Sequence, residues 1–155
     1  MSSMRIVRHI RASRASVYAA LLDSEMVKQW KVPDGMTCFV HTFEAKVGGR
    51  IRISLTHETP TGSGKTSAHT DTYCGRFLTL VPNEKIIEVD EFETTNPAFQ
   101  GEMTITIKLF DKIDGTELIA VHDGLPSGIS SADNRLGWQM ALNKLAKLVE
   151  TKPQE

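Results

Sequence analysis

The chain has 155 residues, 18 basic and 19 acidic side chains, a formal net charge of −1 and an apolar fraction of 40%. This length favours one domain with its own buried core, and the balanced charge argues against nucleic acid or an anionic membrane as a partner. No run approaches the roughly 18 apolar residues of a membrane span, and the N-terminus lacks a secretory signal pattern. We expect one cytoplasmic domain over residues 1–155, with its core at about residues 4–150.

The first segment predicts a strand followed by two short helices. The strand covers residues 4–11, where Ile6 and Ile10 alternate with polar neighbours. Ser13 is a suitable N-cap for the first helix, and Asp23 or Ser24 for the second. A Pro-Asp-Gly sequence directly after the second helix ends it.

From Met36 to Asp123 the period of the apolar residues changes from 3.6 to 2, which predicts consecutive antiparallel strands joined by short turns. In the first of them the alternation places Phe39, His41 and Phe43 on the inward face. The six strands are expected at residues 36–47, 50–57, 72–81, 85–93, 102–110 and 116–123.

The C-terminal segment 130–150 is the only long stretch with clear helical periodicity. Ser130 and Asp133 form a capping-box-like start, and lysines near the end suit the helix dipole. Gly137 interrupts the helix at a cost of about 1 kcal/mol relative to Ala. The residues on its apolar face are Trp138, Ala141, Leu142, Leu145, Leu148 and Val149.

These elements predict an α+β fold in which a curved antiparallel sheet of about seven strands wraps round the long C-terminal helix. One helix is about 10 Å wide, whereas seven strands at ~4.8 Å span more than 30 Å. A flat sheet would stay uncovered, so the sheet must curl round the helix. An incompletely filled hollow between helix and sheet is the expected result.

The order of elements and several short motifs resemble the START-like (SRPBCC) superfamily, which has a helix-grip fold, and within it the branch homologous to the C-terminal domain of the activator of heat-shock protein 90 ATPase. The resemblance implies a small-ligand cavity, a chaperone partner or a cyclase-like activity, since members differ widely in function. The residues that carry it are Val17-Tyr18, Asp23-Ser24-Glu25, Trp30, Gly48-Gly49-Arg50, Gly75, Val81–Ile86, Gly115–Leu118, Val121–Leu125 and Gly137-Trp138.

One segment, Thr59–Thr66, ends in Gly-Lys-Thr like a phosphate-binding loop. That motif needs a glycine at the position of Thr59 and a helix directly after the loop. The sequence has threonine at the first position and predicts a strand after the loop. We interpret the segment as a loop between strands at the mouth of the hollow.

No cofactor or metal is expected, because none of the five histidines shows metal-ligand spacing. Cys38 and Cys74 are expected to be reduced. The strands that carry the two cysteines are separated by a third strand, so their Cα atoms should lie about two strand spacings, or about 9.6 Å, apart. This distance exceeds the ~7 Å limit for a disulfide. His122 and Asp123, adjacent on a strand, point to opposite faces and form no dyad.

Inward positions of the predicted sheet, together with the tryptophans of the helices, give the candidate lining of the cavity. Glu91 is the best acid–base candidate if it points inward with Val89, because burial would raise its pKa. Plain core packing is the alternative for each of these side chains. The candidate lining residues are Trp30, Phe39, His41, Ile53, Tyr73, Phe77, Glu91, Met103, Ile105 and Trp138.

Three functions remain open from the sequence. The first, which we favour, is binding of a small apolar molecule by a monomer or homodimer, without assigned chemistry. The second is a partner role like that of the chaperone activator. The third is a polyketide-cyclase-like or hydrolytic enzyme using His41, Tyr73 or Glu91, which requires at least two titratable groups within hydrogen-bond reach.

Overall fold

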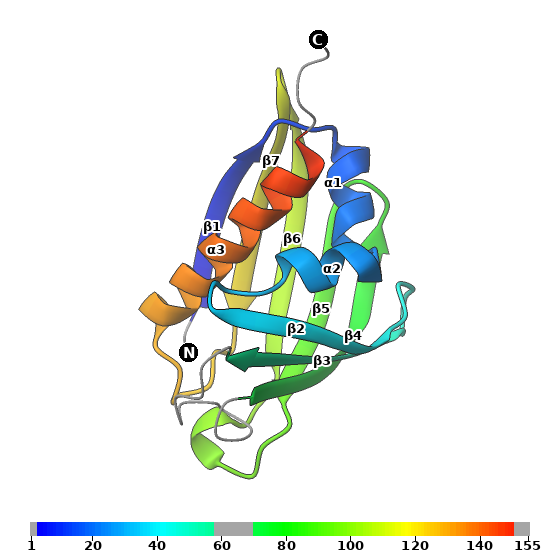
Figure 1. Ribbon diagram of the computed structural model, residues 1–155. Helices are drawn as coiled ribbons and strands as arrows, with labels where there is room; N and C mark the ends of the chain where they lie inside the picture. Colours follow the sequence, from blue (N-terminus) through cyan, green and yellow to red (C-terminus); the bar gives the residue numbers. More distant parts are fainter. Residues whose placement is uncertain (1–2, 58–69, 151–155) are drawn as a thin grey trace.

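The computed structural model describes residues 3–57 and 70–150, which fold into one curved sheet with helices on one side (Figure 1). This is the predicted α+β helix-grip architecture. The elements in chain order are β1 (Ser3–Ile10), α1 (Arg14–Leu21), α2 (Ser24–Trp30), β2 (Met36–Phe43), β3 (Arg50–His57), β4 (Thr70–Val81), β5 (Lys85–Phe92), the 3-10 turn η1 (Pro97–Phe99), β6 (Met103–Lys112), β7 (Gly115–Asp123) and α3 (Ser131–Val149).

The seven strands form one sheet in the order β1-β7-β6-β5-β4-β3-β2, and every neighbouring pair is antiparallel. Strands β2 to β7 make the predicted meander. Strand β1 joins the far side of the meander by pairing with β7, so that Met4 faces His122 and Ile10 faces Thr116. The first strand of the chain therefore closes one end of the sheet and β2 forms the other.

Each predicted N-cap is present and makes the expected hydrogen bond. Ser13 accepts from the backbone N–H of Ser16, and Asp23 from the first turn of α2. The Ser130 hydroxyl accepts from the N–H of Asp133 at 2.9 Å. These side chains satisfy backbone donors that a helix leaves unpaired at its start, which fixes where each helix begins.

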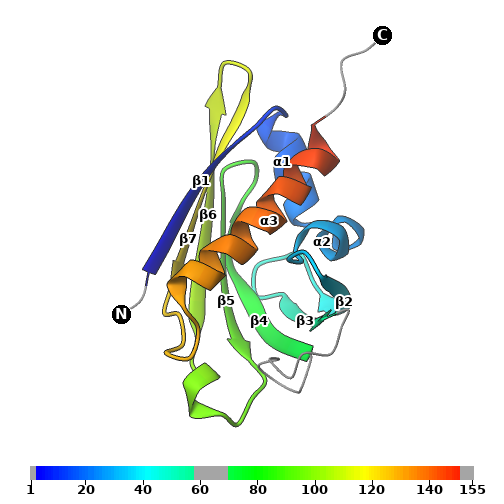
Figure 2. The ribbon, with the colours of Figure 1, turned by 60° about the vertical axis from the view of Figure 1, so that its left-hand side comes forward.

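Figure 2 shows the sheet in profile, with α1, α2 and α3 all on its concave side. α3 runs across the inner face of the sheet, as expected from its apolar stripe. Its buried residues belong to the same hydrophobic cluster as side chains of the sheet such as Ile107 and Leu118. The buried residues of α3 are Ala141, Leu142, Leu145, Ala146 and Val149.

Two bulges interrupt the alternation of side chains. On β2 the register shifts between Val40 and Thr42, which leaves His41 as the extra residue opposite β3. On β4 the shift lies between Phe77 and Thr79, and the exposed Leu78 is the extra residue. A bulge bends its strand and changes which residues face inward, and both help the sheet to curl.

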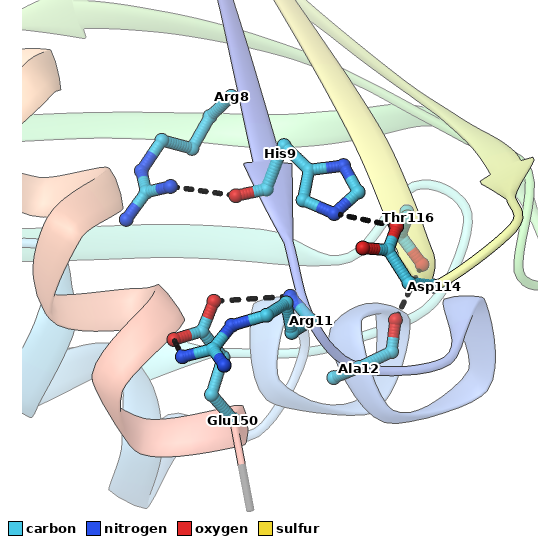
Figure 3. A network of polar contacts seen from close by, with 7 residues as sticks. All are labelled: Arg8, His9, Arg11, Ala12, Asp114, Thr116 and Glu150. Atoms are coloured by element: carbon cyan, nitrogen blue, oxygen red, sulfur yellow. Dashed lines mark hydrogen bonds and ion pairs between the residues drawn. The ribbon is translucent and has the colours of Figure 1, made fainter.

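Polar contacts connect the C-terminal end of β1 with the C-terminal end of α3 and with the turn between β6 and β7 (Figure 3). Glu150 accepts from the backbone N–H of Arg11 at 3.0 Å, and its other oxygen pairs with the Arg11 guanidinium at 3.5 Å. His9 Nε2 lies 3.1 Å from Asp114, and the Thr116 hydroxyl donates to the Ala12 carbonyl at 2.7 Å. The contacts hold α3 at the corner where the sheet meets α1.

Both cysteines are free thiols, with Cys38 on β2 and Cys74 on β4 separated by β3, as predicted. Burial raises the pKa of the Cys38 thiol to about 11, with Lys31 opposing the shift. None of the helices in residues 3–57 and 70–150 is long and apolar enough to cross a membrane. The Gly-Lys-Thr segment 59–66 lies outside the described residues.

Candidate functional site

A pocket of about 360 Å³ lies between the inner face of the sheet, the segment after α2 and the N-terminal half of α3. Most of its walls are aromatic or aliphatic, and polar groups lie among them, which is the usual composition of a small-molecule site. The main apolar lining residues are Leu55, Phe92, Phe99, Met103, Ile105 and Trp138.

Four of the ten predicted lining residues border this pocket: Tyr73, Met103, Ile105 and Trp138. Three others are buried in the core away from it. The Trp30 indole donates to the carbonyl of Ala20 at 3.1 Å, Ile53 is fully covered, and Phe77 packs edge-on against Phe43 with ring centroids 5.6 Å apart. That the four bordering residues bind a ligand stays a prediction.

The predicted inward orientation of Phe39 and His41 is wrong. Phe39 is 63% exposed, and His41 lies on the outer face with Nε2 2.8 Å from the Ser54 hydroxyl. The residues that face inward are Cys38 and Val40, which pair with Leu55 and Ile53 of β3. Apolar residues occur in both phases of β2, so alternation alone did not fix its face, and a slip of one residue exchanges the two faces.

The predicted inward orientation of Glu91 is also wrong, because Glu91 is exposed on the outer face of β5. Glu88 and Asp90 are the acidic residues that point inward, and both are buried. The misleading signal was Val89, which is apolar and covered although it lies on the opposite side of the strand from these carboxyl groups. On this part of β5 the acidic side chains face the interior and the apolar side chain faces outward, which is the reverse of the pattern that usually identifies a core face.

Lys31, directly after α2, reaches across to Glu88 and forms a buried ion pair. Its Nζ lies 3.1 and 3.4 Å from the two carboxylate oxygens, and 5.7 Å from the centre of the Tyr73 ring. Burial opposes the charged form of Lys31, but Glu88, Tyr73 and Asp90 outweigh it and raise its pKa. Burial acts to raise the pKa of Glu88, whereas the charge of Lys31 and the hydrogen bond with Asp90 act to lower it. The net effect is a lowered pKa of Glu88.

The Asp90 carboxyl is the third member of this cluster. Burial, followed by the charge of Glu88 and a hydrogen bond with it, raises the Asp90 pKa well above its usual range. Gly75 lies opposite on β4, where an added Cβ would overlap with Asp90 Oδ1. Only a glycine leaves room for this carboxyl over β4.

His122 on β7 is a buried pocket residue that the sequence did not select. It points inward and Asp123 outward, so the two side chains lie on opposite faces, as predicted. The amide nitrogen of Asn134 donates to His122 Nδ1 at 3.0 Å, so the neutral ring carries its proton on Nε2. Nε2 is buried without a hydrogen-bond partner among the described residues. Burial lowers the pKa of His122 to about 4, against the opposing charge of Glu88.

Tyr73 completes the polar lining on the β4 side. Burial raises the pKa of its hydroxyl, with Lys31 acting in the opposite direction. Its ring also packs edge-on against Phe92, with centroids 6.4 Å apart. Tyr73 therefore remains a neutral side chain, with the ring in contact with the apolar wall.

A family model described as "Activator of Hsp90 ATPase homolog 1-like protein" matches residues 11–150. The chain belongs to this family. A solved structure from Chromobacterium violaceum is 33% identical, with a TM-score of 0.87, and the match covers 97% of this chain and 98% of that chain. The AHSA1 protein from Silicibacter pomeroyi is 16% identical with a TM-score of 0.76, covering 95% of this chain and 96% of that chain, which supports the fold alone. No curated protein matches.

In this member of the activator-like family, the three residues named for the alternative of an enzyme do not converge, because His41 and Glu91 lie on the outer face and Tyr73 on the inner. The titratable groups that do meet are Lys31, Glu88 and Asp90. In residues 3–57 and 70–150 no group of three His, Cys, Asp or Glu side chains is placed to hold a metal ion. The pocket thus combines an apolar wall with an ion pair and a carboxyl group whose pKa is raised by burial.

Proposed function

We propose that this protein binds a small, largely apolar molecule in the pocket between the sheet and α3. The observation that supports it is the 360 Å³ pocket bordered by Trp138, Phe92, Met103 and Ile105. Ligand sites commonly occupy about 300–1,000 Å³ and are mainly apolar. Burial of aromatic and aliphatic ligand surface against such walls supplies the affinity.

The position of Gly137 offers a direct test. This residue borders the pocket, and an added Cβ would have the Pro33 side chain as its nearest neighbour, at 3.6 Å. Gly137→Ala therefore fits, whereas Gly137→Phe would extend into the pocket. We expect an apolar fluorescent probe, N-phenyl-1-naphthylamine, to bind the wild type and Gly137→Ala alike and to bind Gly137→Phe about tenfold more weakly, a change of ~1.4 kcal/mol.

Circular dichroism of the three proteins shows whether they share the same fold. Equal binding by a folded Gly137→Phe variant would contradict the proposed site. Native mass spectrometry of the protein as purified provides an independent measurement, because a copurified small molecule would be lost from the Gly137→Phe variant.

A chaperone partner is the second candidate, and the family description favours it. Such a role needs an accessible surface, and on β2 and the turn after it Phe39 and Val47 are 63% and 64% exposed. Stimulation of the ATPase of heat-shock protein 90 from the same organism would support it, and loss of stimulation in Phe39→Ser would assign it to this surface. Absence of stimulation by the wild type would remove it.

A further inference from the structure

The charged groups at the inner end of the pocket already balance one another. Among the described residues that border the pocket, Lys31 is the only lysine or arginine. Both oxygens of Glu88 lie within 3.4 Å of its ammonium group, and the two side chains are 12% and 5% exposed. Lys31 therefore has little free positive charge to offer a ligand.

The other acidic groups around the pocket work against a negative ligand. Asp71 and Asp133 border it, and Glu88 is the ion-pair partner of Lys31. A ligand carboxylate that approached Lys31 would face the Glu88 carboxylate at short range, because Glu88 pairs with the Lys31 ammonium at 3.1 Å. If it displaced Glu88, it would leave a buried carboxylate unpaired, which is strongly unfavourable.

The neutral donor in the same lining is His122. Its Nδ1 accepts from Asn134, its ring packs edge-on against Trp138 with centroids 6.3 Å apart, and its Nε2–H has no acceptor in the described part of the chain. A buried donor without an acceptor has lost its hydrogen bond to water and gained none in exchange, which is unfavourable. A ligand oxygen at this position removes that cost without introducing a charge.

We infer that the pocket selects neutral molecules with a carbonyl or hydroxyl oxygen, which His122 Nε2 hydrogen-bonds, and rejects the same skeleton as a carboxylate. This inference rests on the proposed function, because it specifies the ligand class for the same pocket. Lys31 and Glu88 act on specificity by neutralising each other, and His122 acts by direct contact with the ligand.

The test compares naphthalene, 2-acetylnaphthalene and 2-naphthoate as competitors of N-phenyl-1-naphthylamine at pH 7. The three share one aromatic skeleton and differ only in the substituent at carbon 2, which is hydrogen, acetyl or carboxylate. We expect 2-acetylnaphthalene to bind about tenfold more tightly than naphthalene, and 2-naphthoate to bind about tenfold more weakly. A tighter naphthoate, or equal binding of the ketone and the hydrocarbon, would overturn the inference.

Two variants assign the effects to residues. His122→Phe should remove the advantage of the ketone, measured as the ratio of the dissociation constants of naphthalene and 2-acetylnaphthalene in the same variant. Glu88→Gln should free the Lys31 ammonium and so improve 2-naphthoate binding relative to naphthalene. If either variant does not fold, the order of affinity of the three ligands for the wild type still tests the inferred ligand class.

The outcomes separate this inference from the proposed function. If the fluorescent probe itself does not bind, the proposed function fails. If the probe binds and is displaced in a different order, or by none of the three ligands, the pocket remains a site and the inferred ligand class is wrong.

Discussion

The ion pair between Lys31 and Glu88 is the residue-level feature on which the interior depends. Its partners come from the end of α2 and from β5, and both are almost completely buried. Removing one partner of a buried pair costs far more than removing both, because the remaining charge has no compensation. The pair therefore restricts which substitutions the interior can accept.

Lys31→Met should accordingly lower the free energy of unfolding by about 3–5 kcal/mol. The double variant Lys31→Met/Glu88→Met should recover most of that loss, because no unpaired charge remains. Urea unfolding at pH 7 measures both. Equal destabilisation in the single and double variants would indicate that the pair contributes by packing alone.

The neutral His122 ring makes stability depend on pH. Its pKa is about 4 in the folded protein, below the ordinary value of 6.5. Between these two values the unfolded chain binds more protons, so its contribution to stability falls as pH decreases from 6.5 to 4, by up to about 3 kcal/mol. The wild type should lose this much more than His122→Phe across that range, as measured by urea unfolding at successive pH values. Parallel curves would contradict the assignment.

The sequence predicted the individual residues of the site less well than it predicted the fold. Tyr73 and Met103 could be placed on the inner face because their strands alternate cleanly. Lys31 gave no signal, since it follows a short helix and reaches its partner only through the fold. His122 lies in phase with the buried Leu118 and Ala120, and this alternation was the signal that would have selected it.

At the level of elements, α3 contains a residue with low helix propensity at the position where the helix borders the pocket. Gly137 is a poor helix former, and its added Cβ would meet only ordinary contact, 3.6 Å from Pro33. Gly137→Ala should therefore raise the free energy of unfolding by about 1 kcal/mol. Urea unfolding at pH 7 checks this value. A decrease would mean that the helix needs closer approach to Pro33 than the structure has.

The elements themselves were largely predictable, since their signals are local. Ser13 and Ser130 identified helix starts, and the strand 50–57 was predicted with its observed ends. The predicted strand 36–47 ends earlier, at Phe43. The turn η1 was not expected, because an Asn-Pro sequence indicates a turn without specifying one helical turn.

At the scale of the whole molecule, α3 joins the helices to the concave side of the sheet, so the domain should unfold in one cooperative step. Leu145 is fully covered on this helix, and Leu145→Ala should cost about 2–5 kcal/mol. The exposed Lys147→Ala is the matched control and should change stability by less than about 0.5 kcal/mol. Far-ultraviolet circular dichroism and fluorescence of Trp30 and Trp138 should give coincident transitions in each protein.

Curvature could be predicted because one helix cannot cover seven flat strands. The pairing of β1 with β7 could not be predicted, because residues far apart in the sequence, such as Val7 and Ile119, carry no local sign of their contact. The same holds for the pocket, whose residues come from the segment after α2, the six strands β2 to β7, the turn η1 and α3 with the loop before it. Long-range arrangement had to come from the structure.

The bulge on β2 has a consequence for insertions and deletions. Without His41, Val40 would still pair with Ile53, and Thr42 and Phe43 would still face Arg52 and Ile51. Deletion of one residue normally exchanges the two faces of a strand downstream of the change. At His41 it would instead restore regular alternation, so homologues one residue shorter at this position can preserve the same inner surface.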